Sequence, residues 1–207
     1  MTRFRQSIPA VSALYFQRTS PWLVTLFFLI SGISAGVFTE LSLPEEEKLR
    51  IGQHLMEHMF LTDTVPSRSA LFLQSAENNL GPLLPVFFSG LTSFGCPVVY
   101  LTVLYKGIAL GFSTTLLMES LGWDGVLTAI LTVLPPGFLA LPSLFLAACT
   151  AINCARNRKL SNRRKKSLSF EAGPYCFCFL LPLILTAAAI VLESFISPAL
   201  LQLIKLQ

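Results

Sequence analysis

Long apolar runs separated by short polar connections make up most of this chain. The first run extends from Trp22 to about Leu41 and contains no charged residue before Glu40. A membrane-crossing helix needs about 20 apolar residues, so this run predicts a transmembrane helix. Four further runs approach or exceed that length, at about 82–104, 107–121, 126–153 and 175–196. Tyr105-Lys106 is expected to be the tight connection between the second and the third run. The pattern predicts an all-α, polytopic integral membrane helical bundle of five transmembrane helices, forming a single membrane domain over residues 1–207.

The composition supports a membrane class and excludes several others. Hydrophobic residues make up 53 % of the 207 residues and charged residues only 13 %, whereas soluble domains carry roughly 25 % charged residues. A soluble chain this apolar could not cover its surface with polar groups. A water-soluble enzyme domain, a disordered tail and a disulfide-stapled secreted module are therefore not expected.

The distribution of charge predicts the orientation in the membrane. Basic residues gather at the N-terminus and in the loop 154–172, whereas the loop 42–79 carries many carboxylates. Short loops rich in Lys and Arg stay on the cytoplasmic side. The N-terminus and the basic loop are thus expected in the cytoplasm, and the 42–79 loop and the C-terminus outside. The basic loop is expected to rest on lipid headgroups; it has no interleaved aromatic residues, and nucleic-acid binding is not expected.

The loop 42–79, called the outer loop below, is predicted to contain an amphipathic helix. Ser42 suits an N-cap, Pro44 the first turn, and the acidic run after it the positive end of the helix dipole. His54 and His58 lie one turn apart on this helix, but the Glu57 between them is misplaced for a zinc protease motif. No metal ligand set is therefore expected.

Small residues within the apolar runs predict close helix packing. Gly32 and Gly36 are four residues apart in the first run, and Gly107 and Gly111 have the same spacing in the third. Such pairs let two helix backbones approach closely. They fit a tightly packed bundle or a homo-oligomer, and chance spacing in an apolar chain is the remaining reading.

Two other intramembrane features are candidates for function. Pro135, Pro136 and Gly137 predict a break near the middle of the fourth run, because two prolines remove two backbone donors. Broken helices line binding sites in transporters and also occur as plain packing kinks, and both readings stay open. Glu193 near the end of the last run is expected close to the outer interface, where solvation is the favoured reading and a functional acid the alternative.

The chain offers no signature of catalysis. It has no Ser/His/Asp set, no Gly-rich phosphate loop and no soluble domain large enough to enclose a substrate. The prediction is a protein that is not an enzyme, with no catalytic, cofactor-binding or metal-binding residues.

Several segments carry a family resemblance. They are Tyr105-Lys106-Gly107 followed by Gly111-Phe112, Leu121-Gly122-Trp123-Asp124-Gly125, Val133-Leu134-Pro135-Pro136, and the stretch from Ala187 through Glu193 to Ser197-Pro198. Together, in this order and spacing, they closely resemble the stage II sporulation protein M family. The resemblance covers the chain from the first apolar run to Pro198.

The resemblance implies a multi-pass protein of the bacterial cell membrane, in the mother-cell and septal membrane during forespore engulfment. It implies a scaffold that recruits and holds two peptidoglycan-degrading partners, resembling sporulation proteins D and P, at the septum. The outer loop would be the docking surface for those partners. Relatives in organisms that form no spores suggest the alternative, a permease-like subunit working with a separate ATPase.

Overall fold

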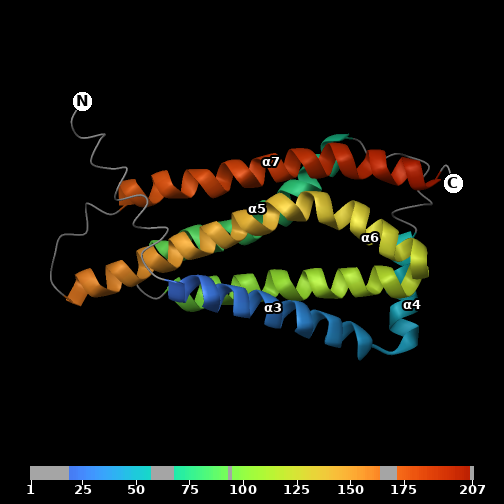
Figure 1. Ribbon diagram of the computed structural model, residues 1–207, viewed down its shortest axis with the longest axis horizontal. Coiled ribbons are helices and arrows are strands. Elements are labelled where there is room, and N and C mark those ends of the chain that lie inside the picture. Colours follow the sequence, from blue (N-terminus) through green and yellow to red (C-terminus); the bar gives the residue numbers. More distant parts are fainter. Residues whose placement is uncertain (1–18, 57–67, 93–94, 164–171, 206–207) are drawn as a thin grey trace.

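The computed structural model describes residues 19–56, 68–92, 95–163 and 172–205, and these are helical apart from short connections (Figure 1). The helices are α3 (Thr19–Leu41), α4 (Glu45–Met56), α5 (Arg68–Gly90), α6 (Gly95–Arg163) and α7 (Ala172–Lys205). No strand occurs in the described ranges. The expected all-α class is confirmed for this part of the chain.

Helix α6 reverses direction at Gly122. This residue has φ 60° and ψ −129°, a left-handed conformation that glycine adopts at low cost. The reversal divides α6 into a first arm, residues 95–121, and a second arm, residues 123–163, which returns beside it (Figure 1). The turn lies between the third and fourth apolar runs, where the sequence pattern places a connection.

The core lies where α5, both arms of α6 and α7 meet. Each of these segments contributes fully buried apolar side chains. Examples are Val86 from α5, Val103 from the first arm, Ile152 from the second arm and Tyr175 from α7. Helix α3 packs along the first arm, and α4 crosses the end of the bundle where α3 ends (Figure 1).

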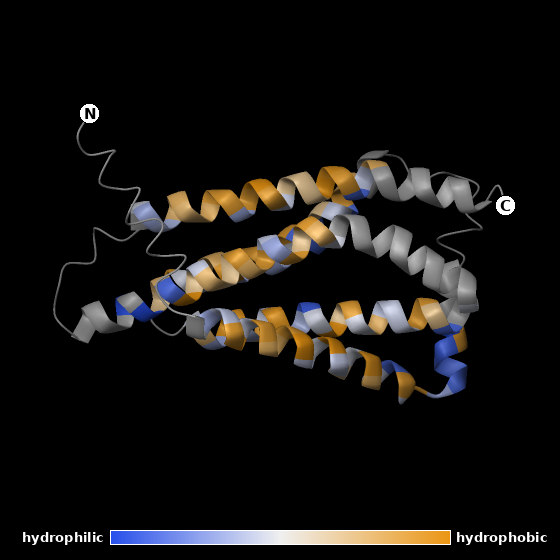
Figure 2. Ribbon diagram, viewed as in Figure 1, coloured by the Kyte–Doolittle hydropathy of each residue, from blue (hydrophilic) through white to orange (hydrophobic). Residues whose placement is uncertain are grey.

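Four described segments are long and apolar enough to cross a membrane: Pro21–Leu41, Gly95–Glu119, Gly137–Arg156 and Gly173–Phe195. The chain is therefore a helical membrane protein. Helix α5 is not among them, although it lies inside the bundle. Figure 2 shows apolar residues along α3 and α7 and a hydrophilic α4.

The boundaries of the second and third expected spans were wrong. The run 82–104 is interrupted after Gly90, where the chain turns through bonds such as Thr92 N to Ser89 O. A Cβ on Gly95 would overlap the Ser89 carbonyl, so this tight turn needs glycine. The pair Tyr105–Lys106, expected to be a connection, lies in the middle of the first arm.

The expected break at Pro135, Pro136 and Gly137 is not present in the backbone. The second arm is helical through these residues, and Gly122 is the residue of α6 with non-helical angles. Proline lacks the amide hydrogen but keeps a helix-compatible φ, so a helix can continue through a proline pair. The side chains of Pro135 and Pro136 lie outside the described set.

The structure confirms a helix in the outer loop, α4, but the residue that begins it differs from the expected one. The Pro44 carbonyl accepts the first helical bonds, from Glu47 N and Lys48 N. Ser42 does not cap α4, because its hydroxyl donates back to the Phe38 carbonyl of α3, at 2.8 Å. Residues 57–67, which include His58, lie outside the described part of the chain.

Candidate functional site: a polar cluster between α5, α6 and α7

Glu193 of α7 accepts two hydrogen bonds from α5. Its Oε2 accepts from Ser75 Oγ at 2.7 Å and from Asn79 Nδ2 at 2.6 Å. Ser75 and Asn79 are buried, at 4 % and 8 % exposed. The same Asn79 amide also donates to the Ser75 carbonyl at 3.0 Å. Glu193 is therefore held by specific donors between two helices, and the expectation of a simply solvated carboxylate was wrong.

Lys106 of the first arm contacts the same stretch of α5. Its Nζ donates to the Asn78 backbone carbonyl at 2.9 Å and to Asn78 Oδ1 at 2.8 Å. Because Asn78 and Asn79 are neighbours, the cationic and the anionic side chain reach adjacent residues of one helix. We call the residues Ser75, Asn78, Asn79, Lys106 and Glu193 the polar cluster.

The polar cluster links α5 to α6 and α7 in addition to the apolar core. Ser75, Asn78 and Asn79 have the i, i+3, i+4 spacing that places side chains on neighbouring helix positions. An ionisable group inside a membrane is costly unless it is paired or hydrogen-bonded. The bundle supplies a charge from each side of α5, and a helix too polar to count as a span is thereby stabilised within it.

The glycine pairs form the contact between α3 and the first arm. A Cβ on Gly107 would lie 2.7 Å from the Leu29 carbonyl oxygen and 3.1 Å from the Gly32 Cα. Cβ atoms on Gly36 and Gly111 would overlap the carbonyls of Ile108 and Ile33. The two motifs therefore face each other within one chain, which is the packed-bundle reading of these residues.

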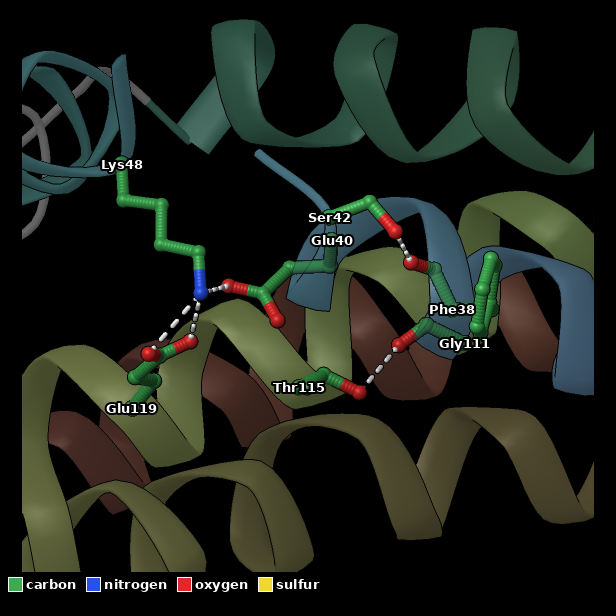
Figure 3. Close-up of polar contacts among 7 residues, drawn as sticks. All are labelled: Phe38, Glu40, Ser42, Lys48, Gly111, Thr115 and Glu119. Carbon is green, nitrogen blue, oxygen red and sulfur yellow. Dashed lines mark hydrogen bonds and ion pairs between the residues drawn. The ribbon is translucent and has the colours of Figure 1, made fainter. Parts of the chain in front are cut away.

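A second charged group lies where α4 crosses the end of the bundle (Figure 3). Lys48 Nζ donates to both carboxylate oxygens of Glu119, at 2.8 and 2.9 Å, and lies 3.7 Å from Glu40 Oε1. Glu40 is fully buried at the end of α3, and neither of its oxygens accepts a hydrogen bond. We call Glu40, Lys48 and Glu119 the end cluster. The pKa of Lys48 is raised above its usual value because its ammonium donates to Glu119, so Lys48 is a cation at neutral pH.

The opposite end of α5 is capped by side chains from α6 and α7. Arg158 Nη1 donates to the Leu91 carbonyl at 2.8 Å, and Tyr175 Oη donates to the Phe87 carbonyl at 2.8 Å. A cation at the C-terminus of a helix interacts favourably with the helix dipole. Arg158, which the sequence placed in the basic loop, is thus also a structural residue of the bundle.

Sequence reasoning named Lys106 and Glu193 singly but missed the residues that hold them. The spacing of Ser75, Asn78 and Asn79 was the available signal, hidden because their segment was assigned to an outer loop. Glu40, Lys48 and Glu119 were also missed, because their association depends on how α4 folds back. Among the described residues, no three His, Cys, Asp or Glu side chains are grouped so that they could hold a metal ion.

Comparison with known proteins decides the family. The family model described as stage II sporulation protein M matches residues 24–198, from the start of α3 into α7. The chain belongs to this family. No significant match was found among curated proteins or among solved structures. The resemblance drawn from the sequence motifs is confirmed, and stage II sporulation protein M membership makes this chain a sporulation-related membrane protein.

Proposed function

We propose that this protein is a non-enzymatic membrane scaffold that recruits peptidoglycan-degrading partners to the septum during engulfment. The match to the stage II sporulation protein M family over residues 24–198 carries the proposal. Helix α4 would form the surface that the partners contact. On α4, the side chains of Glu45, Glu46, Glu47, Leu49 and Arg50 are exposed.

The proposed orientation treats α5 as a fifth crossing. Successive segments then alternate in direction along the bundle, in the order α3, α5, first arm of α6, second arm of α6, and α7 (Figure 1). With the N-terminus in the cytoplasm, Arg158 and the basic residues that follow it are cytoplasmic, in agreement with the positive-inside rule. Helix α4 and the C-terminus would then lie outside, on the side where the cell wall is.

The test is affinity purification of the tagged full-length protein from starved, sporulating cells of the source organism, followed by mass spectrometry. The proposal expects wall hydrolases in the eluate. A variant with Glu45, Glu46 and Glu47 all changed to Gln should lose them, whereas the matched control Glu77→Gln, an exposed acid of α5, should keep them. Recovery of an ATPase with no hydrolase would contradict the scaffold.

The polar cluster favours a second candidate function, a permease-like subunit that works with a separate ATPase. A lysine and a glutamate hydrogen-bonded between helices are typical of solute and proton pathways. For this candidate, Glu193→Gln should abolish solute flux in cells that keep a normal amount of the protein in the membrane. Under the scaffold proposal the same variant should still retain the hydrolases.

A further inference from the structure

Helix α4, which has 12 residues, is held at the end of the bundle by Lys48. Its described side chains, at residues 45–51, are exposed or half-buried, and Leu49 is 63 % exposed. Lys48 Nζ donates to both carboxylate oxygens of Glu119, at 2.8 and 2.9 Å, and lies 3.7 Å from Glu40 Oε1 (Figure 3). An isolated helix shorter than about 12–15 residues is marginal in water, so α4 needs such contacts to stay helical.

Glu40 distinguishes this contact from an ordinary surface ion pair. An exposed pair contributes little to stability, and Glu119 is 48 % exposed. Glu40 is 0 % exposed, however, and neither of its oxygens accepts a hydrogen bond. Among the described residues, Lys48 is the cation that forms an ion pair with Glu40. Removing one member of a buried ion pair leaves an uncompensated charge, which is far more costly than losing an exposed pair.

The turn between α3 and α4 keeps Lys48 close to Glu40. Leu43 N donates to the Glu40 carbonyl at 3.0 Å, and Lys48 N donates to the Pro44 carbonyl at 3.1 Å. These bonds tie the start of α4 to the end of α3, so α4 can move away from the bundle only by rotating about residues 42–44. Such a rotation would separate Lys48 from Glu40 and admit water to the Glu40 carboxylate.

We propose that α4 is a hinged flap, and that the Lys48 ammonium holds it closed by neutralising the buried Glu40. In the closed position Glu40 keeps its counter-ion and is shielded from water. In the open position Glu40 is hydrated and Lys48 is free in solvent. Glu40 and Lys48 thus control the position of the helix that carries the proposed partner surface. The flap goes beyond the scaffold function, and its test does not need the partners.

Hydrogen–deuterium exchange of the purified full-length protein in mild detergent tests the flap, with mass spectrometry of peptides from α4. An open α4 loses helical protection, so its amides report opening. Lys48→Met should speed their exchange at least about tenfold, because a charged hydrogen-bonded contact is worth about this factor. Adding Glu40→Gln to Lys48→Met should return the rate to within about threefold of the unmodified protein, since replacing both members of a buried pair is often close to neutral.

Two single variants serve as comparisons. Glu119→Gln leaves the counter-ion of Glu40 in place and should speed the exchange of α4 by no more than about threefold. The matched control Arg50→Met removes an exposed cation of the same helix and should leave the rate unchanged. An effect of Arg50→Met as large as that of Lys48→Met would show that any positive charge on α4 suffices, and the proposal would be wrong.

Three further outcomes would overturn the proposal. If Lys48→Met exchanges as slowly as the unmodified protein, Lys48 does not hold α4 closed. If the double variant exchanges as fast as Lys48→Met alone, Lys48 acts through Glu119, and the role given to Glu40 is wrong. Peptides from α7 should exchange at the same rate in every variant. Faster exchange there would show a general loss of stability and not the opening of α4.

Discussion

Lys106 and Gly107 are adjacent in the sequence, and they contact different neighbours by opposite means. Gly107 belongs to the contact with α3, where a Cβ would lie 2.7 Å from the Leu29 carbonyl oxygen. Lys106 belongs to the contact with α5, where its ammonium donates twice to Asn78. The first arm of α6 thus makes two kinds of contact side by side. Its contact with α3 needs residues without side chains, and its contact with α5 needs a long charged side chain.

The difference shows two ways in which helices associate without a hydrophobic driving force. In lipid, apolar side chains gain little by leaving the surrounding chains, so association depends on close packing and on interhelical hydrogen bonds. The glycine contact uses close backbone approach and has no room for an added atom. The polar cluster uses hydrogen-bond donors and acceptors. Its stability depends on the chemical identity of each side chain and not on small side-chain size.

The largest expected effect comes from adding one methyl group to the glycine contact. In Gly111→Ala the new Cβ would overlap the Ile33 carbonyl oxygen and lie 3.0–3.1 Å from two other backbone atoms of Ile33. Backbone cannot rotate away, so α3 must shift, and the free energy of unfolding should fall by about 3 kcal/mol, the upper end for overpacking. Titration of the purified protein from mild detergent into dodecyl sulfate measures this change.

The control for that variant is Gly81→Ala in α5. Nothing lies within 4 Å of a Cβ built on Gly81. Replacing a helical glycine with alanine should raise the free energy of unfolding by about 0.5–1 kcal/mol. Equal effects at Gly111 and Gly81 would show that the contact with α3 does not depend on close backbone approach.

A medium effect is expected from the charged contact of the polar cluster. Asn79→Ala removes a donor from Glu193, and its cost, measured by the same unfolding titration, should be about 1.5 kcal/mol, near the largest values for interhelical hydrogen bonds in membranes. Glu193→Ala should cost a similar amount. Because both variants break the same bond, the double variant should cost less than the sum of the two.

The control cycle pairs Asn79→Ala with Glu77→Ala, an exposed acid on the same helix. These two changes share no hydrogen bond and should add. Additive costs for Asn79 and Glu193 as well would mean that their contact stabilises nothing, and the comparison with the glycine contact would fail.

The two contacts also differ in how far the sequence could predict them. Gly32, Gly36, Gly107 and Gly111 repeat a local motif, and their association was one of the alternatives that the motif predicts. The all-α membrane class and the reversal near Gly122 follow equally from local patterns, since runs of apolar residues and glycine-rich turns are short-range signals.

The polar cluster could not be assembled in the same way. Lys106 was assigned to a connection because the apolar run 82–104 looked continuous, and α5 was divided between that run and an outer loop. Hydropathy cannot identify a polar helix whose charged partners lie on other helices, since Ser75 and Glu193 are joined only by folding. The predicted break at the proline pair was wrong for a related reason. The rule that proline interrupts a helix is local and takes no account of the surrounding helices.

The smallest effect isolates what charge adds to a hydrogen bond in this bundle. Ser143 is fully buried in the second arm, and its hydroxyl lies 2.6 Å from the Pro182 carbonyl oxygen and 2.5 Å from Thr186 Oγ1, both in α7. In Ser143→Ala the Thr186 hydroxyl can turn to the Pro182 carbonyl one turn before it, so no group is left unsatisfied. The loss of unfolding free energy should be about 0.6 kcal/mol, the average for interhelical hydrogen bonds in membranes.

The control is Ser113→Ala, which should cost nothing measurable because the exposed Ser113 hydroxyl bonds only within its own helix. A cost for Ser143→Ala as large as that for Asn79→Ala would mean that the charge of Glu193 adds nothing to the contact with α5.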